Sequence, residues 1–392
     1  MQLKSRKSEY SSGFFIIPLF RKLVMYCLVL LYICVIDKDK SMMRRCLYQW
    51  MVMTMFIVIF VGCKNEEKNP RVKGAEGTYV IGKQEGRSLL WKEGMEMQLP
   101  DGMNVSDVYV SNGDIYIVGV LSDDAYNYKA ILWKNGEQII LSEGYSRAGV
   151  SSVTISGNDV YIAGFVLDEE QNSVATLWKN GEMIFLNNGN KDTYGYSIAV
   201  AGEDVYVAGV CKNIEGTEDV VLWKNNEVTV LHEGGVEAIN DVKVSISSGG
   251  VYVVASANVW HLSSDYLSFA WKNGEELFFE GNESSVCIND VFAVGNDVYM
   301  SGYTMNNRER LAATLWKNGK MIQLYDGEWS SRAKAVFVAG DYVYVAGEVY
   351  ENSKIEKAKL WKMNTKSGKI QTIELSDGIV GAEVTGLFVV EE

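Results

Sequence analysis

The chain has 392 residues, of which only 3 are Pro, while 37 are Gly, 10 are Trp and 22 are Tyr. Ordinary usage gives roughly 5% Pro, so this composition predicts many regular β-strands joined by glycine turns. It excludes the collagen-like, Pro-rich disordered and coiled-coil classes of protein. The 47% apolar content also excludes a wholly disordered chain.

The charge of the chain is unevenly distributed. Residues 1–62 hold 9 of the 37 Lys and Arg and 3 of the 50 Asp and Glu, which leaves 28 basic and 47 acidic residues and a net charge of −19 beyond residue 62. Such an acidic body repels phosphate backbones, which argues against nucleic acid as a partner. Cys211 and Cys287 are the only cysteines beyond Cys63, so we expect no disulfide framework and no zinc site.

The N-terminal region has the pattern of a secretory signal. Two arginines precede an uncharged apolar run at 51–61, and a small residue and Cys63 follow it. The sequence FVGC at 60–63 resembles the lipobox of bacterial lipoproteins. The resemblance implies a signal peptide at 42–62, lipidation of Cys63, including palmitate, and a lipid anchor in the bacterial outer membrane, on the periplasmic side or at the cell surface. The alternative is a buried or membrane-spanning helix that happens to end in Cys.

Residues 1–41 fit that signal poorly because they carry a second apolar stretch. Its uninterrupted part, 23–36, is short of the ~20 residues that cross a bilayer. We expect translation to begin at Met42 or Met43 and residues 1–41 to be a misassigned start; the alternative is a genuine extra membrane segment. Residues 1–62 are then the leader, and the charged segment 63–76 is predicted to be a tether.

Seven copies of one unit of about 45 residues fill the remainder. The unit contains a Leu-Trp-Lys tripeptide or a near variant, often followed by Asn-Gly, which is the strongest short signal for a β-hairpin. A second signature, VYVAG in its clearest form, lies upstream of the tripeptide. The recurring tryptophans are Trp91, Trp133, Trp178, Trp223, Trp271, Trp316 and Trp361, and the recurring tyrosines are Tyr79, Tyr116, Tyr161, Tyr206, Tyr252, Tyr299 and Tyr344.

Each unit reads as a four-stranded antiparallel meander, and seven such units predict an all-β, seven-bladed β-propeller at 77–392. The first unit begins at its second strand, near Thr78, and the chain ends in a lone strand at 384–390. We expect these two strands to pair within one blade and close the ring.

The LWKNGE units resemble the HAF-type extracellular repeat and, more loosely, kelch-like propeller repeats. The resemblance covers residues 78–390 and implies a scaffold without implying an activity. We expect the recurring Trp and Tyr side chains to pack between blades. The acidic residues of the short turns, Asp114, Asp159, Asp204 and Asp297, are expected to serve turn chemistry rather than calcium binding.

Function is expected where the repeat varies, on the longer loops opposite the short turns. The longest loop, 256–269, holds Trp260, His261 and Tyr266, and the connection near 325–332 holds Trp329. Exposed aromatic rings stack on sugar rings or anchor a protein partner; the alternative is that they pack over neighbouring loops.

A second candidate site is the mouth of the central channel. The residue expected just before the innermost strand is Asp107, Ser152, Ser197, Asp241, Asp290, Ala335 or Gly386, depending on the blade. Asp107, Asp241 and Asp290 are candidates to hold a cation or to orient sugar hydroxyls. The alternative is that they accept hydrogen bonds from backbone amides.

No catalytic residue, metal site or cofactor is predicted, because the sequence lacks nucleophile, phosphate-loop and metal-spaced motifs. The sequence therefore favours a lipid-anchored binding protein whose ligand is a glycan or an envelope protein. A polysaccharide lyase or glycosidase that uses channel-mouth carboxylates is the competing interpretation. A structural scaffold for outer-membrane assemblies is the third.

Overall fold

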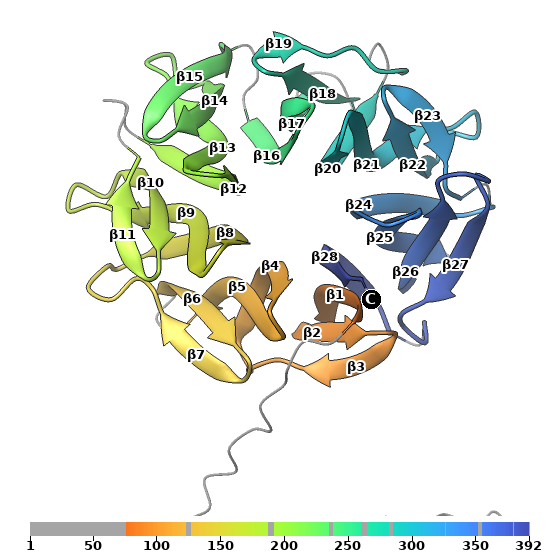
Figure 1. Ribbon diagram of the computed structural model, residues 1–392, viewed down its shortest axis with the longest axis horizontal. Coiled ribbons are helices and arrows are strands. Elements are labelled where there is room, and N and C mark those ends of the chain that lie inside the picture. The colour runs from red at the N-terminus through yellow and green to blue at the C-terminus, as the bar shows by residue number, and fades with distance from the viewer. Residues whose placement is uncertain are drawn as a thin grey trace, which may run out of the picture. The chain divides into compact units, whose positions relative to one another are not determined.

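The computed structural model describes residues 76–122, 127–186, 192–234, 238–259, 265–281, 285–325, 327–351, 355–378 and 380–391. All of them belong to the unit Asn69–Glu392. Within these ranges every helix or strand is a β-strand, and the strands form seven four-stranded sheets around a central channel (Figure 1). The same ranges contain no helix that is long and apolar enough to cross a membrane. The predicted seven-bladed propeller is confirmed.

Each blade is named here by its strands, from the channel outward. Blade 1 is β28 (Ala382–Val390), β1 (Gly77–Gln84), β2 (Arg87–Lys92) and β3 (Met95–Gln98); blade 2 is β4 (Met103–Ser111), β5 (Asp114–Ser122), β6 (Tyr128–Lys134) and β7 (Glu137–Ile140); blade 3 is β8 (Ala148–Ser156), β9 (Asp159–Leu167), β10 (Ser173–Lys179) and β11 (Glu182–Phe185). Blade 4 is β12 (Thr193–Ala201), β13 (Asp204–Lys212), β14 (Glu218–Lys224) and β15 (Glu227–His232); blade 5 is β16 (Ala238–Ser247), β17 (Gly250–Val259), β18 (Asp265–Lys272) and β19 (Glu275–Glu276). Blade 6 is β20 (Val286–Val294), β21 (Asp297–Met305), β22 (Leu311–Lys317) and β23 (Lys320–Gln323); blade 7 is β24 (Ser330–Ala339), β25 (Tyr342–Glu351), β26 (Ile355–Asn364) and β27 (Ile370–Glu374).

The two ends of the propeller meet in blade 1. Strand β28 pairs antiparallel with β1, from Gly77 opposite Val390 to Gln84 opposite Ala382. The inner strand of this blade therefore comes from the C-terminus and the other three strands come from the first unit (Figure 1). The predicted closure of the ring is confirmed, and the closure leaves no unpaired strand edge between the first and last units.

Apolar clusters between adjacent blades form the core. The described residues contain seven such clusters, and each includes one of the recurring tryptophans. Some indoles also bind the preceding blade through a hydrogen bond: Trp178 Nε1 donates to the carbonyl of Leu141 at 3.0 Å, and Trp316 Nε1 donates to that of Glu280 at 2.8 Å. The tryptophans therefore pack between blades, as predicted.

A β-bulge in each inner strand explains the glycine of VYVAG. In blade 3 the pairing of β8 with β9 slips between Val150 and Ser152. A Cβ atom on Gly164 would overlap the carbonyl oxygen of Gly149, so this close approach requires Gly. Blade 5 has Ala255 in place of that Gly.

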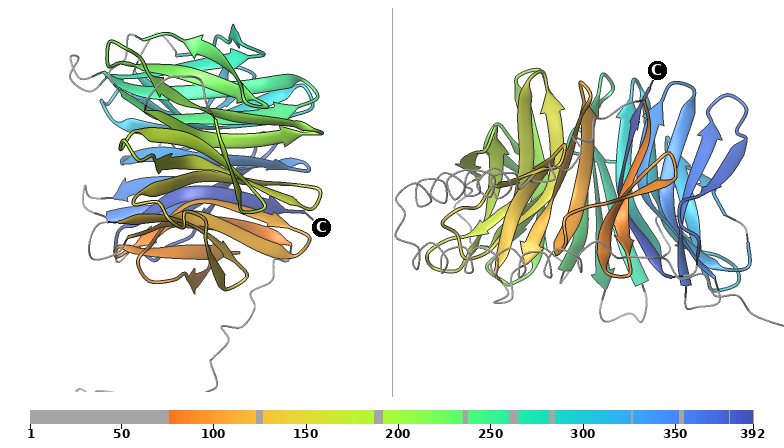
Figure 2. Two further views of the ribbon diagram at one scale, coloured as in Figure 1. Left: turned by 90° about the vertical axis from the view of Figure 1, so that its left-hand side faces the viewer. Right: turned by 90° about the horizontal axis from the view of Figure 1, so that it is seen from below.

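The propeller has two different faces, and Figure 2 shows it from the side, with one face at each end of the strands. The turn face carries the short turns between the first and second strands and between the third and fourth strands of each blade. On it, Asp114 lies 3.0 Å from Lys134 Nζ and accepts a hydrogen bond from Asn135 Nδ2 at 2.7 Å. The same arrangement recurs at Asp159, Asp204 and Asp297. The opposite face, called the loop face, carries the longer connections.

Candidate binding site at the loop-face end of the channel

Seven equivalent positions form a ring inside the channel. Each position lies on the inner strand, opposite the residue of the second strand that stands two places after the recurring Tyr. In blade 3, for example, Ser152 lies opposite Ala163. The ring consists of Asp107, Ser152, Ser197, Lys243, Asp290, Ala335 and Gly386. These residues lie within the inner strands and not before them, contrary to the prediction.

Blade 5 corrects the prediction further, because Lys243 and not Asp241 holds its ring position. The pairing of β16 with β17 slips between Ile239 and Asp241, so this bulge lies farther toward the loop face than the bulges of the other blades. Lys243 consequently pairs with Val254, two places after Tyr252. Asp241 lies in the loop-face part of the channel instead.

Asp107 and Asp290 join neighbouring blades through backbone amides. In each residue Oδ1 accepts a hydrogen bond from the amide of the following residue, at 2.8 Å and 2.9 Å respectively. Oδ2 of Asp107 accepts hydrogen bonds from Val153 N at 3.0 Å and from Ser152 Oγ at 2.9 Å, and Oδ2 of Asp290 accepts one from Val336 N at 2.8 Å. These two carboxylates thus make the backbone contacts that were the alternative to ligand binding.

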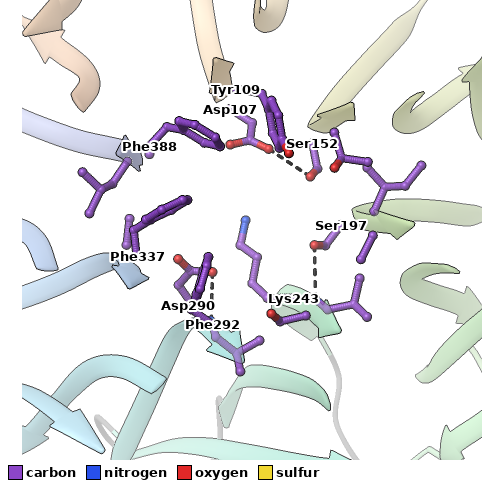
Figure 3. A pocket seen from close by; sticks show the side chains of 18 of the residues that line it. Asp107, Tyr109, Ser152, Ser197, Lys243, Asp290, Phe292, Phe337 and Phe388 are labelled. Atoms are coloured by element: carbon purple, nitrogen blue, oxygen red, sulfur yellow. Dashed lines mark hydrogen bonds between the residues drawn. The ribbon is translucent and has the colours of Figure 1, made fainter. Parts of the chain in front are cut away.

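Lys243 places a positive charge in the middle of the channel, where Figure 3 shows its Nζ pointing inward, and Lys334 lines the same channel. Nζ lies 3.3 Å from the carboxylate of Asp241. Burial opposes the charge of Lys243, but the nearby carboxylates of Asp241, Asp290 and Asp107 outweigh burial and raise its pKa. Burial raises the pKa of Asp290 to about 7 and also raises the pKa values of Asp107 and Asp241. The lysine therefore compensates a partly desolvated acidic ring.

Aromatic rings line the channel on its turn-face side (Figure 3). The ring centroids of Tyr109 and Phe388 are 4.4 Å apart, those of Phe388 and Phe337 are 4.8 Å apart, and those of Phe337 and Phe292 are 4.6 Å apart. They border a cavity of about 300 Å³ that also contacts Lys243. This arc was not predicted from the sequence, although each of its members stands two residues after a ring position.

Two further cavities adjoin on the loop face, and Arg332 and Tyr350 line both. The mouth cavity, of about 380 Å³, opens from the channel and is lined by Asp241, Lys243, Asn289, Arg332, Lys334, Glu348, Tyr350, Glu356, Glu383, Val384 and Thr385. The outer cavity, of about 330 Å³, is lined by Arg310, Leu311, Trp329, Ser330, Arg332 and Tyr350.

Arg332 lies between two tyrosine rings. Its guanidinium carbon is 5.4 Å from the ring centroid of Tyr303 and 5.1 Å from that of Tyr350. Nη1 donates to the hydroxyl of Tyr350 at 2.8 Å, and that hydroxyl donates to Glu348 Oε2 at 3.1 Å. The positions of the tyrosines thus fix the plane of the guanidinium.

Glu348 connects this group to the strand that closes the ring. Its side chain is buried, with 2% of its surface exposed, and Oε1 accepts a hydrogen bond from Val384 N at 2.9 Å. Burial raises the pKa of Glu348. Glu348 thus joins Arg332, through Tyr350, to the strand that closes the ring.

Of the predicted loop aromatics, the structure describes Tyr266 and Trp329. Tyr266 packs edge-on against Tyr303, with ring centroids 5.3 Å apart, and Trp329 packs on the core between blades 6 and 7 and lines the outer cavity. Both therefore lie near Arg332, which the sequence analysis missed. Trp260, His261 and Cys63 lie outside the described residues, and ligand binding by the candidate residues remains a prediction.

A metal site is not formed within the described ranges. They contain no group of three or more His, Cys, Asp or Glu side chains that could hold a metal ion.

Similarity to known proteins is found among solved structures. No protein-family model matches the sequence, and no curated protein matches it. Among solved structures, the chain is similar to an acylaminoacyl peptidase of Pyrococcus horikoshii (13% identity over 77% of this chain and 50% of that chain, TM-score 0.45). It is also similar to an oligogalacturonate lyase of Vibrio parahaemolyticus (12% identity over 76% of this chain and 86% of that chain, TM-score 0.44). A third similar structure is a putative TolB of Agrobacterium tumefaciens (11% identity over 81% of this chain and 100% of that chain, TM-score 0.38).

These similarities concern the fold alone. The chain spans about half the length of the Pyrococcus peptidase, and the identities are too low to transfer an activity. The protein is a seven-bladed β-propeller.

Proposed function

We propose that the chain is a binding protein of the bacterial envelope, anchored by a lipid on Cys63, and that its loop face binds a glycan. One observation carries the proposal: Trp329 and Tyr350 line the outer cavity together with Arg332, and Tyr303 and Tyr266 pack next to the arginine. Aromatic rings provide flat apolar faces for sugar rings, while the arginine and the tyrosine hydroxyls provide hydrogen bonds.

The size of the cavities and the departure of this region from the repeat support a ligand-binding role. Cavities of about 380 and 330 Å³ fall in the range of small-molecule sites, roughly 300 to 1,000 Å³. In blade 7, Arg332 lies opposite Glu348 of the second strand. The equivalent pair in blade 3 is Gly149 opposite Phe165, so a glycine occupies the position of the arginine there. The repeat itself does not require an arginine at this position.

The proposal favours binding over catalysis. A lyase or glycosidase needs a carboxylate that is free to exchange a proton with the sugar. Glu348, the most buried carboxylate of the mouth cavity, accepts hydrogen bonds from Val384 and Tyr350, which supports a role in ordering the site.

A glycan array tests the binding role. The protein that begins at Cys63 is compared with its Tyr350→Ala and Trp329→Ala variants, because both side chains line the outer cavity. Loss of a stacking ring is expected to weaken binding about 3- to 10-fold. Tyr128→Ala is the matched control. Tyr128 also stacks on an arginine, with the guanidinium carbon of Arg147 5.0 Å from its ring centroid, but this pair lies at blades 2 and 3, away from the proposed site. An absence of glycan signals, or equal losses in all three variants, contradicts the proposal.

Cell fractionation tests the anchor separately. The Cys63→Ala variant is expected to leave the membrane fraction because it lacks the thiol that accepts the lipid. Equal membrane association of the variant and the native chain contradicts lipid anchoring without affecting the glycan proposal.

A further inference from the structure

The distribution of arginines indicates the chemical class of the ligand. Beyond residue 62 the chain is strongly acidic and has six arginines. Three of them, Arg308, Arg310 and Arg332, lie within 25 residues of one another in the sequence. Arg310 and Arg332 both line the outer cavity. An otherwise acidic protein thus concentrates positive charge beside the aromatic residues of the proposed site.

Among the described residues Arg332 makes no direct ion pair, and the carboxylate of Glu348 contacts it through the hydroxyl of Tyr350. Among the described residues its guanidinium makes a single hydrogen bond, to Tyr350, and no carboxylate lies within ion-pairing distance. Its Nε is buried and also lacks a hydrogen-bond partner there. By contrast, Lys243 pairs with Asp241, and Lys359 pairs with Glu374 at 2.9 Å. A guanidinium has five N–H donors, so most of those of Arg332 are not used by the described fold.

The two cavities differ in the charge of their walls. The mouth cavity contains the carboxylates of Asp241, Glu348, Glu356 and Glu383 in addition to its cations. Among the described residues, the lining of the outer cavity includes two arginines and no carboxylate. An anionic group is therefore favoured in the outer cavity and disfavoured near the channel, which gives a ligand one orientation.

Resting on the proposed function, we infer that the glycan contains a uronic acid whose carboxylate binds in the outer cavity to Arg332 and Arg310. A guanidinium held in one plane matches the two oxygens of a carboxylate. Trp329, in the same wall, provides the surface for the sugar ring. The hydroxyl groups of the ligand then extend toward the acidic mouth cavity.

The test uses pairs of glycans that differ only at the acidic group. An array presents uronic-acid oligosaccharides, the same oligosaccharides with their carboxylates reduced to alcohols, and sulfated neutral oligosaccharides. Hits are titrated by calorimetry against the chain beginning at Cys63. The uronic-acid member is expected to bind at least about 10-fold more tightly than its reduced counterpart, and less tightly at high salt.

Variants assign the effect to the outer cavity. Arg332→Gln is expected to weaken uronate binding about 10- to 100-fold and to leave the reduced glycan unaffected. Arg332→Lys is expected to restore part of the affinity, because it keeps the charge but loses the planar fork. Arg147→Gln is the control, since Arg147 also stacks on a tyrosine but lines neither cavity. Thermal midpoints establish that each variant is folded.

The outcomes separate the two proposals. Equal binding of acidic and reduced glycans, with no effect of Arg332→Gln, overturns the uronate inference and leaves glycan binding intact. Binding of the sulfated glycans alone overturns the assignment of a carboxylate. An absence of glycan binding by the folded native chain overturns both the inference and the proposed function.

Discussion

The turn face and the loop face use their charged residues in opposite ways. On the turn face, Asp114, Lys134 and Asn135 contact one another, and three other blades repeat this arrangement. On the loop face, Arg332 stacks on Tyr350 and makes no direct ion pair among the described residues, since Glu348 contacts it through the hydroxyl of Tyr350. Side chains that recur around the ring are therefore paired within the fold, and a side chain that interrupts the repeat retains unused hydrogen-bond donors.

The channel lies between these extremes, because its charges interact both within one blade and between blades. Lys243 faces Asp241 of its own blade and interacts with Asp107 and Asp290 across the channel. Asp107 and Asp290 in turn bind amides of the next blade. Charges in the channel thus stabilise the ring, which predicts that their removal affects stability before it affects ligand binding.

The largest expected effect follows deletion of residues 384–392, which removes most of β28. Val384, Leu387 and Val389 of this strand are buried in the cluster between blades 7 and 1. Burial of three such side chains contributes on the order of 5 kcal/mol, which is comparable to the stability of a typical domain. We expect the truncated chain to unfold or to oligomerise through the exposed edge of β1.

Thermal denaturation and size-exclusion chromatography measure the effect of this deletion. Removal of Glu391 and Glu392 alone is the control, because it leaves β28 complete. A truncated chain that remains monomeric with an unchanged thermal midpoint contradicts the role of β28 in closing the ring.

A smaller but substantial effect is expected for Lys243→Met. The substitution removes the cation that interacts with the carboxylates of Asp107, Asp241 and Asp290, although Lys334 still lines the channel. Removal of one partner from a buried ion pair costs about 3–5 kcal/mol. Since the channel also contains solvent-accessible space, we expect a loss of about 2–4 kcal/mol in the free energy of unfolding at pH 8. Chemical denaturation measures this loss, and Lys243→Arg is the matched control that keeps the charge. An undiminished stability of the Met variant contradicts the proposed charge compensation.

Repetition explains how much of the fold could be predicted from the sequence. The spacing of the tryptophans predicted the blades, and the incomplete first unit predicted the closing strand. The prediction of Asp241 as the ring residue of blade 5 was wrong. The sequence Asn-Asp-Val at 240–242 matches Asn-Asp-Val at 289–291, where Asp290 does occupy the ring position. The displaced bulge makes these segments structurally inequivalent. Counting nine residues back from Tyr252, as from Tyr161 to Ser152, would have identified Lys243.

The candidate site was less predictable for a physical reason. Tyr266, Tyr303 and Arg332 belong to three consecutive blades, and their contacts arise only when the blades pack. No sequence periodicity connects them, because each occupies a position where the repeat varies. The cluster of arginines at 308–332 was a signal in the sequence, but the structure was needed to show that it adjoins the aromatic residues.

The pH dependence of stability is expected to reveal the raised pKa of Asp290. Burial raises its pKa from 3.8 to about 7, against the lowering effect of Lys243. The folded state therefore retains a proton that the unfolded state releases between these values. This contribution to stability is fully present below pH 3.8 and is lost as pH rises through about 7.

Denaturation at about pH 5 and pH 8 measures this contribution in the native chain and in Asp290→Asn. We expect the native chain to be less stable at the higher pH, by roughly 1–3 kcal/mol from this group. The Asn variant is expected to lose most of that difference, because an amide does not ionise. If the variant retains the full pH dependence, the proton is bound elsewhere.

The smallest effect is expected on the turn face, for Asp114→Asn. The carboxylate of Asp114 is about one-third exposed and lies 3.0 Å from Lys134, so solvent screens the ion pair. Such pairs contribute about 0–1 kcal/mol. Hydrogen bonds from Lys134 and Asn135 lower the pKa of Asp114, so its contribution is present above its ordinary pKa and is lost as pH falls below it. We therefore expect a small loss of stability near pH 7 that vanishes in high salt or acid, measured by thermal denaturation. A loss as large as that of Lys243→Met would contradict the difference between exposed pairs on the turn face and buried pairs in the channel.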